Sequence, residues 1–124
     1  MGARQDDAAW TKVFETSAAH AYDSVMVTDA EHRIVHTNPA FTQLTGYAPE
    51  EVAGSTPGFL QGPKTDREVI DRLHRTLEQG EVFEGSTVNY RKDGSEFDIQ
   101  WRVVPVRDDA GTLTHYVTVQ RDVS

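Results

Sequence analysis

The chain of 124 residues is long enough for one domain built around a single hydrophobic core. Its 12 basic and 20 acidic side chains give a net charge of −8, which argues against binding to nucleic acid or to an anionic membrane. Because there is no cysteine, the chain can form no disulfide, no thiolate metal site and no thiol nucleophile. The polar, acidic N-terminus and the lack of a long apolar run predict a cytoplasmic domain without membrane insertion.

The N-terminal third of the chain predicts one helix and a hairpin of two strands. Apolar residues recur at helical spacing within residues 1–20. The residues of this stripe are Trp10, Val13 and Phe14. Segments rich in β-formers at residues 24–29 and 33–38 are separated by a polar turn and pair as a hairpin. We therefore expect a flanking helix at residues 1–20 and a main domain at residues 21–124.

Two short helices and an aperiodic stretch follow. Asn38 as N-cap and Pro39 in the first turn open a helix that ends at Gly46. A second short helix runs over residues 49–54 and is stopped by its terminal glycine. Residues 55–64 have no helical or strand period, and we expect a loop there.

A longer helix is predicted between Thr65 and Gly80. Thr65 and Glu68 have the spacing of a capping box, in which each side chain bonds the other residue's backbone. The apolar stripe of this helix consists of Val69, Ile70, Leu73 and Leu77. Such a stripe faces a core, so the helix should pack against the rest of the domain.

Three strands complete the chain, at residues 83–92, 96–107 and 114–123, joined by polar turns. Two strands, then helices, then three strands is an order typical of an α+β fold. We expect an antiparallel sheet with its helices gathered on one face.

Seven short motifs in this order resemble the PAS sensor family across essentially the whole chain. They are residues 27–29, 38–41, 44–47, 50–54, 90–94, 105–108 and 121–124. The resemblance implies a five-stranded sheet of strand order 2-1-5-4-3, with helices that close a small pocket over its concave face. It also implies a sensory or interaction module of a larger bacterial signalling protein, such as a sensor histidine kinase of a two-component system or a diguanylate cyclase.

The sequence gives no sign of catalysis by the chain itself. It has no serine–histidine–aspartate elbow, and its one glycine-dense run, residues 54–62, lacks the lysine that would follow in a phosphate-binding loop. We expect any kinase or cyclase activity to lie in an effector domain.

Within the PAS family, residues 59–66 most resemble the LOV branch, the flavin-binding blue-light sensors. Asn89 and Gln120 match positions that hydrogen-bond the flavin ring in that branch, and strand alternation around them predicts one pocket face. The predicted ligand-pocket residues are Gln61, His74, Thr87, Asn89, Phe97, Ile99, Trp101, Tyr116, Thr118 and Gln120.

The match to the LOV branch breaks where its chemistry occurs. Pro57 stands where that branch has the cysteine of the photoadduct, and Gly58 and His74 stand where it has arginines for the flavin phosphate. Ile99 replaces an asparagine that binds the ring edge. We therefore expect no bound cofactor, a possible small-molecule ligand and no cysteinyl photochemistry. The alternative is a flavin sensor, with FMN or FAD, that responds by redox change or photoreduction.

Histidine spacing argues against a metal site, because no pair has ligand spacing on one helical face. Some PAS domains bind haem through a histidine on the long helix, where His74 lies. A half-buried histidine bonded to backbone is the more ordinary interpretation of His74.

The apolar stripe of the flanking helix requires a surface to cover it. That surface is the outer sheet face of its own domain or that of a second copy, and we expect the homodimer. Light scattering on a variant with Trp10→Glu and Phe14→Glu distinguishes the two.

The final residues resemble the exit signal through which many PAS domains pass into a helical linker. We expect Asp122 to pair with Arg107 or Lys92, and Ser124 to cap the helix that follows. In the isolated domain Asp122→Ala should leave stability unchanged.

Overall fold

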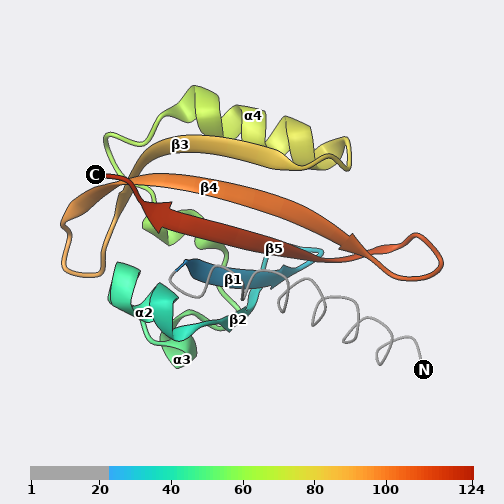
Figure 1. The fold of residues 1–124 in the computed structure, drawn as a ribbon, viewed down its shortest axis with the longest axis horizontal. Coiled ribbons are helices and arrows are strands. Elements are labelled where there is room, and N and C mark those ends of the chain that lie inside the picture. The colour runs from blue at the N-terminus through green and yellow to red at the C-terminus, as the bar shows by residue number, and fades with distance from the viewer. Residues whose placement is uncertain (1–22) are drawn as a thin grey trace.

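A computed structural model of the protein describes residues 23–124, in which one sheet carries helices on one side (Figure 1). The elements in chain order are β1 (Ser24–Asp29), β2 (Ile34–Thr37), α2 (Pro39–Thr45), α3 (Pro49–Val52), the 3-10 helix η2 (Pro57–Leu60), α4 (Arg67–Glu78), β3 (Phe83–Tyr90), β4 (Glu96–Arg107) and β5 (Leu113–Asp122). The flanking helix and its residues Trp10, Val13 and Phe14 lie outside the described residues. That helix, the homodimer and the domain boundary therefore stay predictions.

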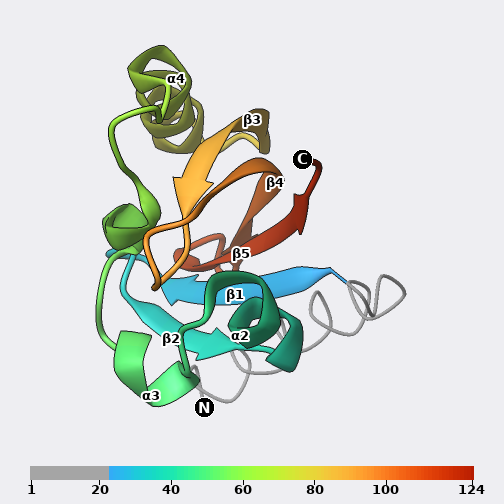
Figure 2. The same cartoon turned by 90° about the vertical axis from the view of Figure 1, so that its left-hand side faces the viewer.

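The sheet is antiparallel with strand order β2-β1-β5-β4-β3, so the predicted architecture is confirmed. The first and last strands of the described chain pair in the middle of the sheet, with Ser24 opposite Gln120 and Asp29 opposite His115. Figure 2 shows α2 and α3 beside β1 and β2, and α4 beyond β3 at the other edge. The two groups of helices therefore lie at opposite edges of the sheet.

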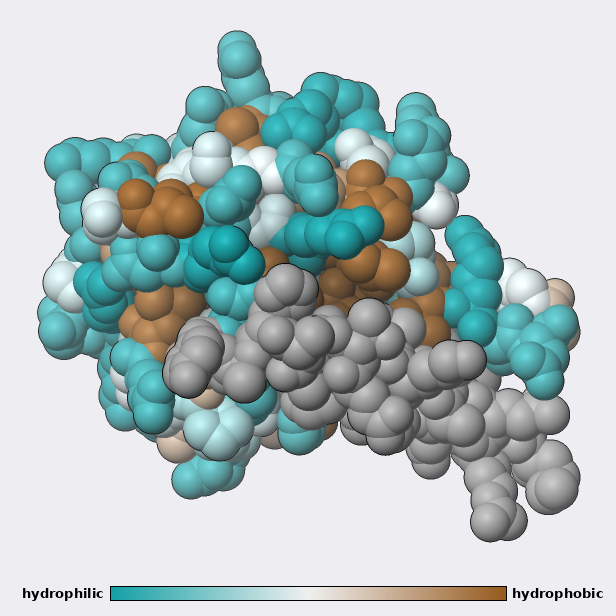
Figure 3. Space-filling model, viewed as in Figure 1, coloured by the Kyte–Doolittle hydropathy of each residue, from teal (hydrophilic) through white to brown (hydrophobic). Residues whose placement is uncertain are grey.

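Strand alternation separates the two faces of the sheet. In β4, Ile99 and Trp101 are 1% and 9% exposed, whereas Gln100 and Arg102 are exposed to solvent. A period of two places successive side chains on opposite faces, so the inner face of β4 is apolar and its outer face carries polar groups. Polar side chains also make up most of the coloured surface in Figure 3, with apolar side chains in smaller patches.

Asn38 ties the first helix to the central strand. Its Oδ1 accepts hydrogen bonds from the backbone N–H of Phe41 (3.0 Å) and of Val25 (2.9 Å). Its Nδ2 donates to the carbonyl oxygen of Asp23 (3.0 Å). The predicted N-cap is thus confirmed, and Gly46 ends α2 at a φ of 82°, a value that favours glycine.

The prediction of a capping box at Thr65 is wrong. Helix α4 begins at Arg67, and the Asp66 carboxylate caps it by accepting from the backbone N–H of Glu68 (3.0 Å). Thr65 is buried, and its hydroxyl accepts from the Gly62 N–H (3.0 Å) and donates to the Val88 carbonyl (2.6 Å). The hydroxyl joins the preceding turn to β3, so it is not available to cap the helix.

Helix α4 is fastened to the edge of β3 by polar groups. The Asp66 N–H donates to Thr87 Oγ1 (2.7 Å), and Arg72 Nη1 donates to the Glu84 carbonyl (3.0 Å). The Arg72 guanidinium also lies 4.7 Å from the centre of the Phe83 ring. These contacts hold the helix at the edge of the sheet, and its Ile70 and Leu77 are buried in one apolar cluster with side chains of β4 such as Ile99.

Gly62 approaches β3 too closely for any side chain. A Cβ atom built there would lie 2.3 Å from Tyr90 Cε1, and the Tyr90 hydroxyl accepts a hydrogen bond from the Lys64 N–H (3.1 Å). We predict that Gly62→Ala lowers the free energy of unfolding by about 1–3 kcal/mol, because the ring must move and this turn must shift. Urea denaturation measures the loss.

Gly58→Ala is the matched control for this prediction. A Cβ atom at Gly58 meets nothing within 4 Å, and we expect a change within about 0.5 kcal/mol. Equal losses in the two variants would contradict the close approach at Gly62.

Candidate functional site

A cavity of about 520 Å³ lies between the inner face of the sheet, α4, η2 and the β1–β2 turn. Its size falls in the range of small-molecule sites. The apolar part of its wall includes Met26, Leu60, Ile70, Leu73, Leu77, Ile99, Trp101 and Val103. The wall therefore offers a flat apolar surface from β4 beneath the apolar side of α4.

Eight of the predicted pocket residues line this cavity. They are Gln61, His74, Asn89, Ile99, Trp101, Tyr116, Thr118 and Gln120. The structure brings them together from four elements and the loop after η2, and their binding of a ligand stays a prediction.

The other two predicted pocket residues lie elsewhere. The Thr87 hydroxyl accepts the hydrogen bond from the Asp66 N–H, so the start of α4 covers it. Phe97 is buried in the core with the guanidinium of Arg91 4.7 Å from its ring centre. Strand alternation correctly predicted that both side chains lie on the inner face of the sheet, but neighbouring parts of the chain cover them there.

Several lining residues were missing from the prediction. Met26 and Thr28 enter from β1 because they pair with Thr118 and Tyr116 of β5. The alternation of β1 together with the strand order could have placed them. His32, from the β1–β2 turn, also lines the cavity. The sequence of this turn indicated only a polar connection between two strands.

Polar groups in the cavity wall differ in how far their hydrogen bonds are satisfied. Gln120 Nε2 donates to the Ser24 hydroxyl (3.1 Å), and Arg67 Nη1 donates to Gln61 Oε1 (2.6 Å). Thr28 is 3% exposed, and its hydroxyl has no hydrogen-bond partner among the described residues. A buried hydroxyl left unpaired costs about 1–3 kcal/mol, so this group would gain from a polar ligand atom.

An aromatic pair stands at the end of the cavity next to the β1–β2 turn. The rings of His32 and Tyr116 stack with centroids 4.7 Å apart and planes 13° apart. Burial, and after it the charge of His74, lowers the pKa of His32. Burial raises the pKa of Tyr116. Both side chains are therefore neutral at pH 7.

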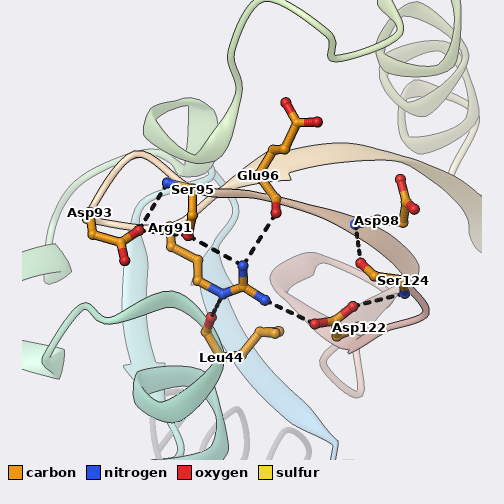
Figure 4. Close-up of polar contacts among 8 residues, drawn as sticks. All are labelled: Leu44, Arg91, Asp93, Ser95, Glu96, Asp98, Asp122 and Ser124. Atoms are coloured by element: carbon orange, nitrogen blue, oxygen red, sulfur yellow. Dashed lines mark hydrogen bonds and ion pairs between the residues drawn. The ribbon is translucent and has the colours of Figure 1, made fainter.

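Arg91 joins three parts of the chain at the opposite end of the sheet (Figure 4). Its Nε donates to the Leu44 carbonyl at the end of α2 (3.1 Å), and its Nη1 donates to the Glu96 carbonyl (3.3 Å). Its Nη2 pairs with Asp122 Oδ2 (2.9 Å) at the end of β5. One guanidinium thus holds α2, the start of β4 and the C-terminal end of β5 together.

The predicted partners of Asp122 are wrong. Lys92 pairs with Glu51, and Arg107 Nη1 donates to the Gly111 carbonyl (3.2 Å). Asp122 lies opposite Ile99 of β4, and the turn that returns from β3 brings Arg91, not Lys92, to this position.

Asp122 and Ser124 are bonded to each other, and Ser124 is bonded to β4. Ser124 Oγ accepts from the Asp98 N–H (2.8 Å), and the Ser124 N–H donates to Asp122 Oδ1 (2.9 Å). The hydrogen bonds from Ser124, and after them the charge of Arg91, hold the pKa of Asp122 below its ordinary value. In this structure the Ser124 hydroxyl fixes the end of β5 to β4, and the predicted capping of a following helix stays a prediction.

Comparison with known families decides the identity of this fold. The PAS domain family model matches residues 23–124. The chain belongs to the PAS domain family. The PAS domain also resembles solved light-oxygen-voltage (LOV) domains. One such solved structure, described as "Flavin Analogue Sheds Light on Light-Oxygen-Voltage Domain Mechanism", superposes on this chain with a TM-score of 0.82. The two sequences are 37% identical, over 88% of this chain and 83% of that chain.

Relatives of this PAS domain are regulators and sensors. The bacterioopsin transcriptional activator of Halobacterium salinarum is 40% identical over 78% of this chain and 14% of its own length. A blue-light-activated histidine kinase of Brucella anthropi is 37% identical over 76% of this chain and 19% of its own length. The PAS domain therefore spans less than a fifth of either relative. It is a sensory module of a type that is not itself catalytic.

Within residues 23–124 of the PAS domain, no helix is long and apolar enough to cross a membrane. No group of three or more histidine, aspartate or glutamate side chains there is arranged to hold a metal ion.

Arg91 is expected to contribute more to stability than Asp122. Arg91→Met leaves the Leu44 and Glu96 carbonyls without their donor, and we predict a loss of about 1–3 kcal/mol in the free energy of unfolding. Asp122→Ala removes a pair whose side chains are 30% and 35% exposed, so solvent screens it and the loss should stay below about 1 kcal/mol.

Lys92→Met is the matched control, because it removes the neighbouring cation of an exposed pair. We expect a loss within about 0.5 kcal/mol in urea denaturation. If Arg91→Met costs no more than Lys92→Met, the joining role of Arg91 is wrong.

Proposed function

We propose that this PAS domain is a ligand-sensing module of a larger cytoplasmic signalling protein and that it works without a cysteinyl photoadduct. The observation that carries the proposal is that Pro57 lines the cavity and the chain has no cysteine. A thiolate is required to form the adduct, so light cannot act through that bond here. The signal is instead the occupation, or a change of state, of the cavity ligand.

The relatives support an effector outside this chain. They are named as a transcriptional activator and a histidine kinase, and the chain matches less than a fifth of each. We propose a sensor histidine kinase, a diguanylate cyclase or a similar regulator as the parent, with its activity in another domain.

The cavity and the exit are connected by β5. Tyr116, Thr118 and Gln120 face the cavity, and Asp122 follows two residues later on the same side of the strand. A ligand that competes for the Gln120 amide would loosen its bond to Ser24 and change the pairing of β5 with β1. Such a change would alter the strain on the Arg91–Asp122 pair and re-orient the linker beyond it.

Flavin is the second candidate ligand, favoured by the polar groups of the cavity. The amides of Gln61, Asn89 and Gln120 and the unpaired Thr28 hydroxyl can meet the polar edge of the ring, while Trp101 supplies a flat wall. A bound flavin would supply redox or photoreduction chemistry. The polar side chains match the hydrogen-bonding edge of the ring, whereas Ile99 contributes no hydrogen bond to it.

The coupling is tested in the full-length parent. We predict that Asp122→Ala uncouples the signal from the output activity while the protein remains folded, because the exit loses its bond to Arg91. Output activity with and without the signal is the measurement. Asp109→Ala, in an exposed turn, is the control and should respond like the parent. An Asp122→Ala parent with unchanged output and response would refute the coupling.

The flavin candidate is tested by visible absorption of the purified chain and of Pro57→Cys. If flavin is bound, we predict that the protein is yellow. Blue light should cause no reversible adduct-like bleaching of the visible band in the natural sequence, but should bleach it reversibly in Pro57→Cys. The thiol is the nucleophile that the natural sequence lacks.

Pro57→Ser is the control, since it changes the backbone in the same way without a thiol. If the protein is colourless and releases no flavin on denaturation, the flavin candidate is rejected and the ligand-sensing proposal remains. Reversible adduct-like bleaching of the natural sequence would overturn the adduct-free proposal itself.

A further inference from the structure

A cluster of valines lies on the outer face of the sheet, opposite the cavity. In β5, Val117 stands between Tyr116 and Thr118, and both of these line the cavity, so the Val117 side chain points to the other face. It belongs to an apolar group that we call the outer valine cluster, which consists of Val25, Val27, Val106 and Val117, with Val119 packed against them. All of these residues come from β1, β4 and β5.

The burial of the outer valine cluster requires a cover that the described helices do not supply. In a single copy of the chain Val27 and Val117 are each 0% exposed. Side chains of α2, α3 and η2 pack with Met26, and those of α4 pack with Ile99, so these helices lie on the inner face. An antiparallel sheet face without a cover stays in contact with water. The cover of the cluster therefore lies outside residues 23–124.

The segment before β1 has the sequence of such a cover. It comprises residues 1–22 and joins the start of β1 directly. Its large apolar side chains recur at i, i+3 and i+4 spacing, which places them on one side of the predicted flanking helix. These are Trp10, Val13 and Phe14. At about 100° per residue, Lys12 falls on the opposite side of that helix.

The length of the segment fits the position of the cluster. From Asp23 to Val27 the strand rises about 13 Å. A helix that turns back over the sheet just before Asp23 carries Val13 about 15 Å along its axis from that turn. Val117 pairs with Val27 on the neighbouring strand, so the apolar side of the helix reaches both valines.

We propose that residues 1–22 fold back over the outer face of their own sheet, with Trp10, Val13 and Phe14 packed on the outer valine cluster. This assignment replaces the homodimer that was expected from the apolar stripe alone. It does not depend on the cavity or on its ligand. While the segment is in place the outer face is closed, so a partner that uses this face must first displace residues 1–22.

Paired cysteines test the contact in the full chain, which has no cysteine of its own. Val104 lies beside Val117 on β4 and is half-buried, and Ala9 and Thr11 flank the predicted apolar stripe. We expect Val104→Cys with Ala9→Cys, or with Thr11→Cys, to be joined by a short bismaleimide within one chain. Denaturing electrophoresis and intact mass spectrometry should then show a cross-linked product of single-chain mass.

The control pair joins the same segment to the opposite side of the domain. Thr11→Cys with Asp71→Cys, on the exposed side of α4, should give no product of single-chain mass. For the pairs with Val104→Cys, a product of twice the chain mass would assign the outer face to a second copy. No product from either pair would show that the segment does not cover this face. Each of these two results would overturn the inference.

Removal of the apolar stripe provides an independent test. We expect Trp10→Glu with Phe14→Glu to uncover the outer valine cluster and to raise severalfold the fluorescence of a dye that binds apolar surface. Lys12→Glu is the matched control, because it changes the net charge by the same amount from the opposite side of the helix, and its dye signal should equal that of the natural sequence. Equal dye signals in the two variants would contradict the proposed cover.

Discussion

The structure depends on how α4 is attached to the sheet. Thr65, Asp66 and Arg72 bond to backbone or side-chain oxygens of β3, so the helix is fixed at one edge by polar contacts. Ile70 and Leu77 of this helix pack into one apolar cluster with side chains of β3, β4 and β5, and a cavity of about 520 Å³ remains between the helix and the sheet. Two of the polar contacts use backbone carbonyl groups of β3, those of Val88 and Glu84. These groups on the open edge of the sheet are therefore not available to pair with a strand of another chain.

Much of the fold could be predicted from local sequence signals. The N-cap at Asn38, the glycine at the end of α2 and the alternation of β4 are each determined by residues close in sequence. The start of α4 was misplaced because Thr65 and Asp66 both have capping side chains. The choice between them is made by β3, since the Val88 carbonyl takes the Thr65 hydroxyl. A contact across 23 residues leaves no local pattern.

The sequence predicted those cavity residues whose positions depend only on strand alternation. Asn89, Trp101 and Gln120 line the cavity because the alternation of three strands directs them there. Thr87 follows the same alternation, but the start of α4 covers it. His32 could not be found from period or composition, because its position depends on one unusual backbone angle and on stacking against a strand distant in sequence. Arg91 was missed for a similar reason, since Leu44 and Asp122 come near it only in the folded chain.

Strand β5, of ten residues, carries Tyr116 at the end of the cavity beside the β1–β2 turn and Asp122 at its opposite end. From Tyr116 to Asp122 the strand rises about 20 Å, so substitutions in the β1–β2 turn need not disturb the contacts of Arg91. Under the proposed function, the residues that bind the ligand and the residues that transmit the signal are therefore different ones. Substitutions in the β1–β2 turn and in α4 would then change the chemical that is detected and leave the contacts at the end of β5 in place.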